Sequence, residues 1–453
     1  MAKKQLTIEE KLEAALVPVE EQPYKVPENW CWVRLDKLYQ VNPKNEDVDE
    51  DTRAAFIPMA NIDGGLTSNF TYEIQSWKQA KKGHTQMADG DVAFAKISPC
   101  FENRKSMIVE GLENGIGGGT TELIILRQPN VNKEYTFWLV STEEFISKGC
   151  TTYSGTVGQQ RISMDFVKNY PVPLAPLNEQ SRIVARIESL FAKLDEAKEK
   201  IQEVLDGADL RRAAILHQAF TGKLTEKWRK ENNNIGQDRW EKKQLKDCCD
   251  IGSGGTPSRK VDAYYQGNIS WVKTGEINWN KIYETEEHIS EEAIKNSSAK
   301  LYQEGTVLVA MYGMGVTRGR AAILQIASAT NQAVCALQPK EQLKNKFLFY
   351  YFMNNYWIIR EKSVGGNQLN LSGKIIGKLE INLPTITEQQ EIVRLLDKLL
   401  SREQSTVTAC EKALATIGVL KKSILARAFR GELGTNDPSE AGAQELLQEI
   451  LAS

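Results

Sequence analysis

The sequence lacks any hydrophobic run long enough to span a membrane. Its longest apolar stretches, such as 321–326, fall far short of the roughly 20 residues that cross a bilayer. The first residues, MAKKQLTIEEKLEAALVPVEEQP, become acidic where a signal peptide would build an apolar core. These absences predict a cytoplasmic protein.

Cysteine and histidine are scarce. The seven cysteines are odd in number, with Cys248 and Cys249 adjacent, and they fit neither a disulfide framework nor the spacing of a zinc site. We therefore expect reduced thiols and no metal. The three histidines, His84, His217 and His288, lie far apart in the sequence and are not expected to be catalytic.

The sequence has no excess of basic residues. Its 57 Lys and Arg against 59 Asp and Glu give a formal net charge of −2, whereas proteins that neutralise phosphates usually carry a basic footprint. Contact with nucleic acid would therefore depend on local patches. Residues 223–246 hold eight basic and four acidic residues, which fits either a solvated linker or a phosphate contact.

Catalytic motifs are also missing. Residues 250–255 (DIGSGG) resemble the loop with which methyltransferases hold S-adenosylmethionine, but an ordinary glycine-containing turn is the better interpretation. An amino-methyltransferase would also need an Asn-Pro-Pro-aromatic or similar tetrapeptide, and the chain has no Pro-Pro. Residues 373–378 (GKIIGK) are one residue too short for a Walker loop and lack its Ser or Thr. We predict a non-catalytic chain without a cofactor of its own.

What the sequence does contain is an internal repeat. LNEQSRIVARIESLF, which begins at Leu177, reappears as ITEQQEIVRLLDKLL at Ile386, and the same offset of 209 aligns AILHQAFTGKL from Ala214 with SILARAFRGEL from Ser423. A repeat of this kind indicates two copies of one structural unit. Each copy has a divergent first part followed by a similar helical part.

The divergent parts read as mixed strand, turn and helix. We expect strands at AFIPM, DVAFAKI and ELIIL in the first part and at TVLVAMY, RAAILQI and AVCAL in the second. With 41% hydrophobic residues, the chain has enough apolar material for two packed cores.

The helical parts have apolar residues at heptad spacing, which is typical of a coiled coil. Each helix is expected to be about 40 residues or roughly 60 Å long, capped near Asn178 and Thr387 and ended by Gly222 and Gly431. We predict that the two helices pair antiparallel, with one domain at each end; the alternative is a homodimer, or helices packed on their own domains. The predicted pairing residues are Ile183, Ile187, Leu190, Leu194 and Ile201, with Ile392, Leu396, Leu399, Ile417 and Leu420.

Polar and glycine-rich loops supply candidate DNA contacts. Arg and Lys suit guanine, Asn and Gln suit adenine, and backbone amides of glycine loops suit phosphate. An ordinary surface turn is the alternative for each loop. The candidates are Lys96, Asn103, Arg104, Lys105, Gln159 and Arg161 in the first part, and Thr256, Ser258, Arg259, Lys260, Tyr312, Arg318, Arg320, Asn331 and Gln332 in the second.

This layout resembles the specificity subunits of Type I restriction-modification enzymes. The resemblance rests on PLAPLNEQSRIV and LPTITEQQEIV at the helix starts, AFTGKLTEKWR and AFRGEL at the helix ends, and IGSGGTPSR and ATNQAV in the second divergent part. The first divergent part resembles the family in order and size more than in motif.

The resemblance implies an α+β fold with two mixed α/β target-recognition domains, separated by two long helices that form an antiparallel coiled coil with an internal pseudo-twofold repeat. The expected parts are an N-terminal helical segment (1–25), target-recognition domain 1 (26–157), helical spacer 1 (158–224), a linker (225–239), target-recognition domain 2 (240–366), helical spacer 2 (367–433) and a C-terminal tail (434–453).

The resemblance also implies a function: recognition of a bipartite double-stranded DNA target, one domain per half-site. The expected partners are two methyltransferase subunits and, in the full complex, restriction and translocase subunits, which would hold S-adenosylmethionine, ATP and magnesium. Two other classes stay open, a single-chain enzyme with fused methyltransferase or nuclease activity, and a scaffold that does not bind DNA.

Overall fold

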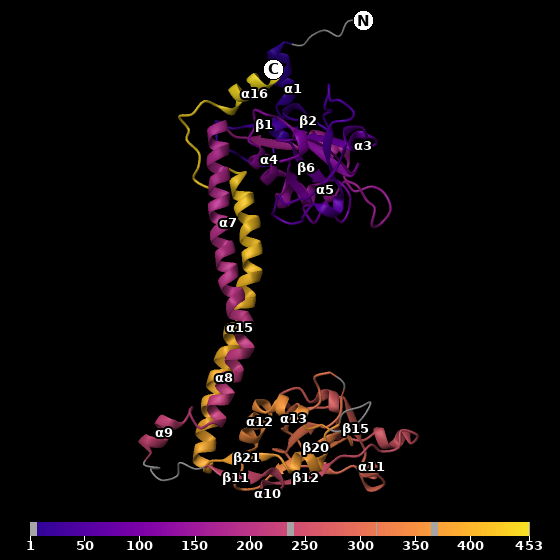
Figure 1. Ribbon diagram of the computed structural model, residues 1–453, viewed down its shortest axis with the longest axis vertical. Coiled ribbons are helices and arrows are strands. Elements are labelled where there is room, and N and C mark those ends of the chain that lie inside the picture. Colours follow the sequence, from indigo (N-terminus) through magenta and orange to yellow (C-terminus); the bar gives the residue numbers. More distant parts are fainter. Residues whose placement is uncertain (1–6, 233–239, 314, 364–369, 453) are drawn as a thin grey trace. The chain divides into compact units, whose positions relative to one another are not determined.

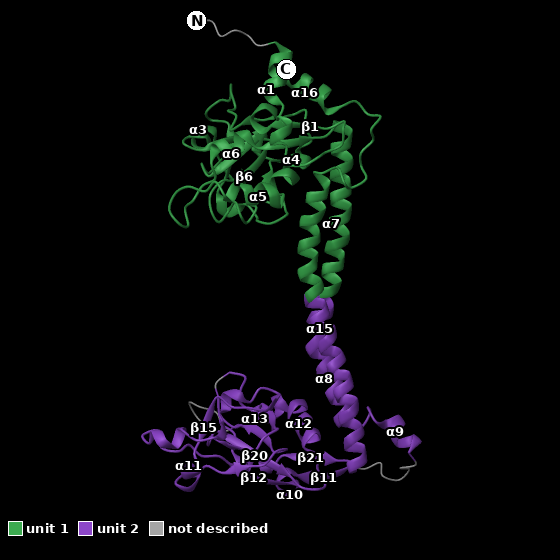
Figure 2. Cartoon of the chain, turned by 180° about the vertical axis from the view of Figure 1, so that it is seen from behind, with its two compact units in different colours: residues 1–201, 412–453 green, residues 202–411 purple. Residues whose placement is uncertain are grey.

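The computed structural model describes residues 7–232, 240–313, 315–363 and 370–452. The chain forms two compact units: unit 1 contains residues 1–201 and 412–453, and unit 2 contains residues 202–411 (Figure 2). Unit 1 is therefore built from two separate stretches of sequence, whereas unit 2 is one continuous stretch. Figure 1 gives the labels of the elements.

Unit 1 contains two four-stranded sheets and one two-stranded sheet. The first has the order β2-β9-β6-β7 and is antiparallel, and the second has the order β4-β3-β8-β5, with β3 and β8 parallel. Its strands are β1 (Cys31–Arg34), β2 (Gln40–Val41), β3 (Arg53–Ile57), β4 (Glu73–Ser76), β5 (Thr85–Ala88), β6 (Val92–Ala95), β7 (Ser106–Ile108), β8 (Ile116–Gly119), β9 (Leu123–Arg127) and β10 (Pro171–Leu174), of which β1 and β10 pair with each other.

Short helices cover one face of the first sheet. The strand β6 is buried on both faces. Val92 and Phe94 belong to the same core as the helix α4 (Lys133–Val140), whereas Ala93 belongs to the core formed with the second sheet. The helices of this unit are α1 (Ile8–Ala15), α2 (Leu35–Leu38), α3 (Trp77–Lys81), α4 (Lys133–Val140), α5 (Glu143–Cys150), α6 (Met164–Asn169), α16 (Ala443–Ala452) and parts of α7 (Leu177–Asp206) and α15 (Ile386–Ala428).

Unit 2 repeats this topology with one additional strand, β14, at the edge of its first sheet. One sheet has the order β12-β20-β17-β18-β14, a second has the order β15-β13-β19-β16 with β13 and β19 parallel, and β11 pairs with β21. Its strands are β11 (Glu241–Gln244), β12 (Cys249–Ser253), β13 (Ile269–Val272), β14 (Asn280–Ile282), β15 (Glu287–Ile289), β16 (Leu301–Tyr302), β17 (Val307–Ala310), β18 (Ala321–Leu324), β19 (Ser328–Thr330), β20 (Val334–Pro339) and β21 (Glu380–Leu383). Its helices are α8 (Ala208–Phe220), α9 (Glu226–Glu231), α10 (Leu245–Cys248), α11 (Glu291–Lys295), α12 (Asn345–Asn354), α13 (Tyr356–Glu361) and α14 (Gly373–Gly377), together with the end of α7 and the first part of α15.

The six strands expected from the sequence are all present, as β3, β6, β9, β17, β18 and β20. In five of them, at least four consecutive residues are buried. A strand that is buried on both faces appears in the sequence as a short continuous apolar run, which is why these strands could be recognised. Short apolar runs bounded by glycine and polar clusters were therefore sufficient to find strands of the core sheet in each unit.

The long helices pair antiparallel within each unit, as predicted. In unit 1, Lys421 of α15 donates to Asp195 of α7 at 2.6 Å and lies 4.9 Å from the centre of the Phe191 ring. In unit 2, Arg211 of α8 bonds Glu403 of α15 at 2.7 Å. Ion pairs at the edge of an apolar helix contact fix its register.

Three details of the helical prediction were wrong. The first helical part is not one helix, because α7 and α8 separate at Gly207. Leu420 is 43% exposed, whereas the side chain of the next residue, Lys421, is 16% exposed and places its ammonium over the Phe191 ring. Asn178 and Thr387 are not caps because they lie inside the first turns of α7 and α15.

The types of residue found at the helix ends agree more closely with the prediction. The hydroxyl of Thr385, one residue before α15, accepts from the backbone N–H of Glu388 at 3.4 Å. Gly222 and Gly431 have φ values of +77° and +72°, a left-handed conformation that glycine adopts readily after a helix end. No helix among the described residues is both long and apolar enough to cross a membrane.

Residues 434–453, expected as a tail, and 225–239, expected as a linker, both contain helices. Ala443, Leu447 and Ile450 of α16 belong to the main core of unit 1, and Lys11 of α1 donates to the carbonyl of Leu451 at 2.9 Å. The helix α9 occupies part of the expected linker.

Candidate DNA interface

We call the two divergent parts, 26–157 and 240–366, the first and second modules. The loop between β6 and β7 holds four of the candidates in the first module, Lys96, Asn103, Arg104 and Lys105, and internal contacts engage the polar groups of the last three. Arg104 donates from Nε to the carbonyl of Ser141 at 3.0 Å and forms an ion pair with Glu143. Lys105 donates to the carbonyl of Met59 at 2.9 Å. The carbonyl of Asn103 accepts from the backbone N–H of Gly65 at 2.7 Å. These contacts hold the loop against its own unit.

Arg161 is also neutralised within the module. It bonds both carboxylate oxygens of Glu122, at 2.9 and 2.7 Å, and its hydrogen bonds lower the pKa of Glu122, with a smaller Coulombic contribution from Lys96. Arg161 also donates to the carbonyl of Gln159 at 3.0 Å. The adjoining loop presents Val157, which is 95% exposed.

In the second module, several candidates meet across two loops. The hydroxyl of Thr256 donates to the side-chain oxygen of Gln332. The side-chain oxygen of Asn331 accepts from the hydroxyl of Thr274 at 3.2 Å and from the backbone N–H of Ala333 at 3.1 Å. The structure thus brings residues 256 and 331–332 together, although 75 residues separate them in sequence.

Arg259 has an aromatic and an acidic partner. Its guanidinium lies 4.1 Å from the centre of the Tyr265 ring and forms a 2.7 Å ion pair with Glu287, whose pKa it lowers. The neighbouring Lys260 is exposed, and its backbone N–H donates to the hydroxyl of Ser258 at 3.4 Å.

The glycine runs pack closely instead of offering amides to phosphate. The backbone N–H of Gly255 donates to the carbonyl of Thr330 at 2.9 Å. A Cβ at Gly254 would lie 1.9 Å from that carbonyl oxygen, and one at Gly118 in β8 would lie 2.0 Å from the carbonyl of Ala80. Glycine is required there because two backbones approach closely, so the phosphate interpretation of the Gly255 amide was wrong.

The loop between β17 and β18 is fastened by a residue that the sequence did not single out. Arg360 of α13 donates to the carbonyl of Arg318 at 2.6 Å and also to the carbonyl of Gly315. Arg320 donates to the side-chain oxygen of Asn278, and Tyr312 is 38% exposed. Arg318 and Arg360 are therefore neighbours in space although they lie 42 positions apart in sequence.

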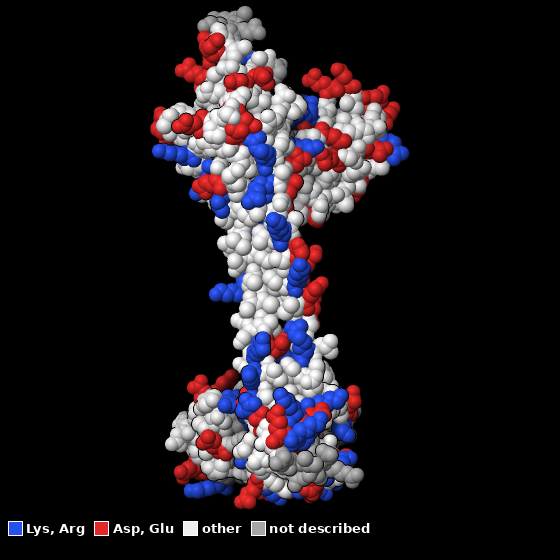
Figure 3. Space-filling view, turned by 90° about the vertical axis from the view of Figure 1, so that its left-hand side faces the viewer, with Lys and Arg blue, Asp and Glu red and all other residues white. Residues whose placement is uncertain are grey.

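Charge is interspersed over much of the surface. On the face shown in Figure 3, basic and acidic side chains alternate over both units. This distribution agrees with the formal net charge of −2. The candidates predicted from the sequence are therefore distinguished by their ion-pair partners and not by the overall charge of either unit.

Comparison with known families assigns both copies of the repeat. The model of the Type I restriction modification DNA specificity domain matches residues 27–206 and, a second time, residues 237–409. The chain belongs to this family. The two matches together cover more than half of the sequence and fall on the two modules with their following helices.

Similar specificity proteins include two from Escherichia coli. The specificity subunit of Type I restriction enzyme EcoAI is 39% identical over 189 residues, which are 41% of this chain and 32% of that protein. The specificity subunit of EcoDI is 22% identical over 435 residues, or 90% of each chain. In its more identical match, the chain therefore spans about a third of the relative's length.

Solved structures of the family share the fold. The HsdS subunit from Thermoanaerobacter tengcongensis superposes with a TM-score of 0.70 at 21% identity, covering 91% of this chain and all of that one. A chain from a structural study of complex assembly in a type I R-M system gives a TM-score of 0.63 at 22% identity, covering 90% of this chain. These likenesses confirm the predicted fold class.

In this specificity-family chain, the repeated Glu-Gln pair anchors each long helix to its module. The side-chain oxygen of Gln180 accepts from the backbone N–H of Asn132, the residue before α4, at 2.9 Å. Gln389 makes the same bond to the N–H of Lys344, the residue before α12, also at 2.9 Å. Both glutamines are fully buried.

The glutamate of each pair accepts a hydrogen bond from the segment that follows the other copy's helical part. Glu179 accepts from the indole N–H of Trp30 at 2.7 Å and from the side chain of Asn436 at 2.8 Å. Glu388 accepts from the hydroxyl of Thr225 at 2.7 Å and pairs with Arg229. The sequence comparison had aligned these glutamates but gave no sign that they are buried.

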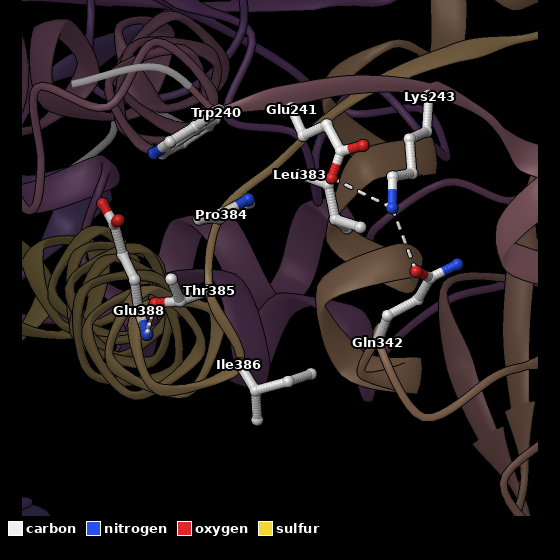
Figure 4. Close-up of a pocket in the computed structure, with 9 residues that line it drawn as sticks. All are labelled: Trp240, Glu241, Lys243, Gln342, Leu383, Pro384, Thr385, Ile386 and Glu388. Atoms are coloured by element: carbon white, nitrogen blue, oxygen red, sulfur yellow. Dashed lines mark hydrogen bonds and ion pairs between the residues drawn. The ribbon is translucent and has the colours of Figure 1, made fainter. Parts of the chain in front are cut away.

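A cavity of about 430 Å³ lies beside Glu388 in unit 2 (Figure 4). Trp240 forms one wall, and Lys243 spans the other by bonding Glu241 at 3.0 Å and Gln342 at 3.1 Å. The charged groups that line it have partners, since Lys243 bonds Glu241 and Gln342 and Glu388 bonds Thr225, so we assign the cavity to the junction between helix and module.

Proposed function

We propose that this chain is the DNA-reading specificity subunit of a Type I restriction-modification complex. Each module would read one half of a bipartite duplex target, and the paired helices would set the unread gap. The observation that carries the proposal is the double family match, because the DNA specificity domain occurs once on each of two modules of the same topology.

The proposed DNA contacts are the exposed polar side chains of the second module together with its arginines. Thr256, Arg259 and Gln332 lie on neighbouring loops, where hydroxyl, guanidinium and amide groups can meet base edges. In the first module, Arg104 and Lys105 support the loop, so base reading there would depend on exposed positions such as Gln159.

The proposed partners are methyltransferase subunits, two for each chain, and restriction and translocase subunits in the full complex. S-adenosylmethionine, ATP and magnesium would be held by those subunits in the cytoplasm, and this chain would be non-catalytic. The relatives support this division because they carry the name of specificity subunits of restriction enzymes.

The net charge of −2 leads to a first prediction about affinity. We expect the isolated chain to bind duplex DNA weakly at physiological salt, because few phosphates would be neutralised until the partners complete a basic channel. Fluorescence anisotropy with and without the methyltransferase subunits measures this. Tight binding by the chain alone would contradict it.

The function itself is tested by comparing the methylated bases of two strains, one with this gene and one without it, both retaining the methyltransferase gene. We expect a bipartite motif to lose methylation when the specificity gene is removed. An unchanged methylome would overturn the proposal. Methylation by the purified chain alone would favour the single-chain enzyme.

A further inference from the structure

An ion pair lies in the contact between the long helices of unit 2, where the heptad pattern predicts apolar residues. Arg211 of α8 donates to the carboxylate of Glu403 of α15 from Nε at 3.0 Å and from Nη2 at 2.7 Å. Arg211 follows Val204 by seven residues, and Glu403 follows Leu396 by seven, so each continues the apolar row of its helix. The Glu403 side chain is 11% exposed, so its charge lies in the helix contact and not on the outer surface.

Gly207 leaves room for this arginine. A Cβ at position 207 would lie 2.6 Å from Nη1 of Arg211. With no side chain there, the guanidinium also reaches back to the carbonyl of Val204, to which Nη2 donates at 2.6 Å. The break between α7 and α8 therefore coincides with the entry of a charged side chain into the helix contact.

An ion pair at this place is not needed to hold the helices together, because replacing a buried ion pair by well-packed apolar residues is often neutral or stabilising. A charged or polar residue within an apolar row has a different effect, which is to select one partner and one register. The alternative partners follow from the internal repeat. Helical spacers 1 (158–224) and 2 (367–433) have similar sequences, so each could pair with the same spacer of a second chain.

The offset of the repeat identifies the residues that would then meet. Subtracting 209 from 403 gives Leu194, and adding 209 to 211 gives Leu420. If spacer 1 paired antiparallel with spacer 1 of a second chain in the same register, Arg211 would face Leu194. If spacer 2 paired with spacer 2, Glu403 would face Leu420. A twofold-symmetric dimer with both contacts would hold two arginines and two glutamates opposite leucines.

We propose that Arg211 and Glu403 make the two helical spacers of one chain pair with each other and prevent each spacer from pairing with its counterpart in a second chain. The proposal goes beyond the proposed function and holds whether or not the chain reads DNA. Spacer 1 of one chain with spacer 2 of another would keep the ion pair. The two spacers of one chain are covalently joined, however, and meet at a higher effective concentration.

The ion pair between Asp195 and Lys421 cannot make this selection. Subtracting the offset from 421 gives Arg212, so Asp195 would also meet a basic residue if two copies of spacer 1 paired. The Asp195 side chain is 52% exposed, and exposed ion pairs contribute little. The two ion pairs join the same helices, so this one supplies a matched control.

The test measures the oligomeric state of the full chain after refolding. The wild-type chain and its Arg211→Leu/Glu403→Leu variant are unfolded in urea, refolded at several protein concentrations and analysed by sedimentation velocity. The wild-type chain should return as a monomer. In the variant, leucine faces leucine in every pairing, so we expect a species of twice the monomer mass whose fraction rises with protein concentration.

Two further variants separate charge selection from added apolar surface. The Arg211→Glu/Glu403→Arg variant restores opposite charges within one chain and still places charges opposite leucines in a dimer, so it should refold as a monomer. The Asp195→Leu/Lys421→Leu variant adds the same number of leucines to the same pair of helices and should also stay monomeric.

Four outcomes overturn the proposal. The first is a monomeric Arg211→Leu/Glu403→Leu variant at every concentration. The second is a dimer of the Asp195→Leu/Lys421→Leu variant, because added apolar surface alone would then cause association. The third is a dimer of the charge-exchanged variant, because opposite charge would then not select the partner. The fourth is loss of helical circular dichroism in the Arg211→Leu/Glu403→Leu variant, which would assign the ion pair a structural role instead.

Discussion

At the scale of single residues, the most constrained groups are the buried Glu-Gln pairs that begin the two long helices. Glu179 and Gln180 are completely buried, and so is Gln389, whereas Glu388 is 4% exposed. Burying a carboxylate is costly unless donors satisfy it. Trp30 and Asn436 donate to Glu179, so this carboxylate ties a module residue and a late segment to the start of α7.

Removing this carboxylate leaves buried donors unpaired. We predict that Glu179→Ala lowers the free energy of unfolding of unit 1 by about 3 kcal/mol, since hydrogen bonds to charged groups contribute most and unsatisfied donors are penalised. Urea unfolding followed by tryptophan fluorescence measures the change. Glu188→Ala, at an exposed position on the same helix, should change stability by no more than about 0.5 kcal/mol. Equal stabilities of the two variants would refute the anchoring role.

At the scale of elements, apolar contacts hold the long helices, but not every residue predicted to pair takes part in these contacts. Leu425 of α15 is 1% exposed and belongs to the core of unit 1, while Leu420, five residues earlier on the same helix, is 43% exposed. Burial, and not heptad position alone, decides which leucines contribute to stability.

This difference predicts unequal effects of the same substitution. Leu425→Ala should destabilise unit 1 by about 2–5 kcal/mol, because it removes buried methyl groups and leaves a cavity. Leu420→Ala should cost less than about 1 kcal/mol, because its side chain keeps much of its contact with water. Thermal unfolding of the two variants makes the comparison. A large loss at Leu420 would show that it contacts another chain.

Much of the architecture could be predicted because its signals are local or repeated. Short apolar runs marked β6 and β17, and the 209-residue offset marked the two helical parts. The exposure of Leu420 and the partners of Glu179 depend on contacts between segments far apart in sequence. No periodicity within one segment carries that information.

For the candidate interface, the sequence identified the types of residue but not the groups that each residue contacts. The sequence alone does not distinguish Arg104, Arg161 and Arg320. In the structure, the first two have carboxylate partners and the third contacts an amide. Arg360 was missed because it lies on a helix, outside any polar or glycine-rich loop. An acid that neutralises an arginine is recognised only when the fold brings the two together.

At the scale of the whole molecule, two modules of one topology predict two independent readers. Exchanging residues 26–157 for the corresponding module of a relative should change one half of the recognised target and leave the other half intact. Sequencing of methylated bases in cells that carry the hybrid measures the result, and exchange of residues 240–366 is the reciprocal control. A change in both halves after either exchange would contradict independence.

The composition of unit 1 has a consequence for the order in which the molecule can fold during synthesis. Unit 2 is complete once residue 411 has left the ribosome, whereas unit 1 needs residues 412–453 as well. Until then, Glu179 lacks Asn436, and the core around Ala15 and Val33 lacks α16. Although domains generally fold in order from the amino end, here the module made first is the one that must wait longest for its last contacts.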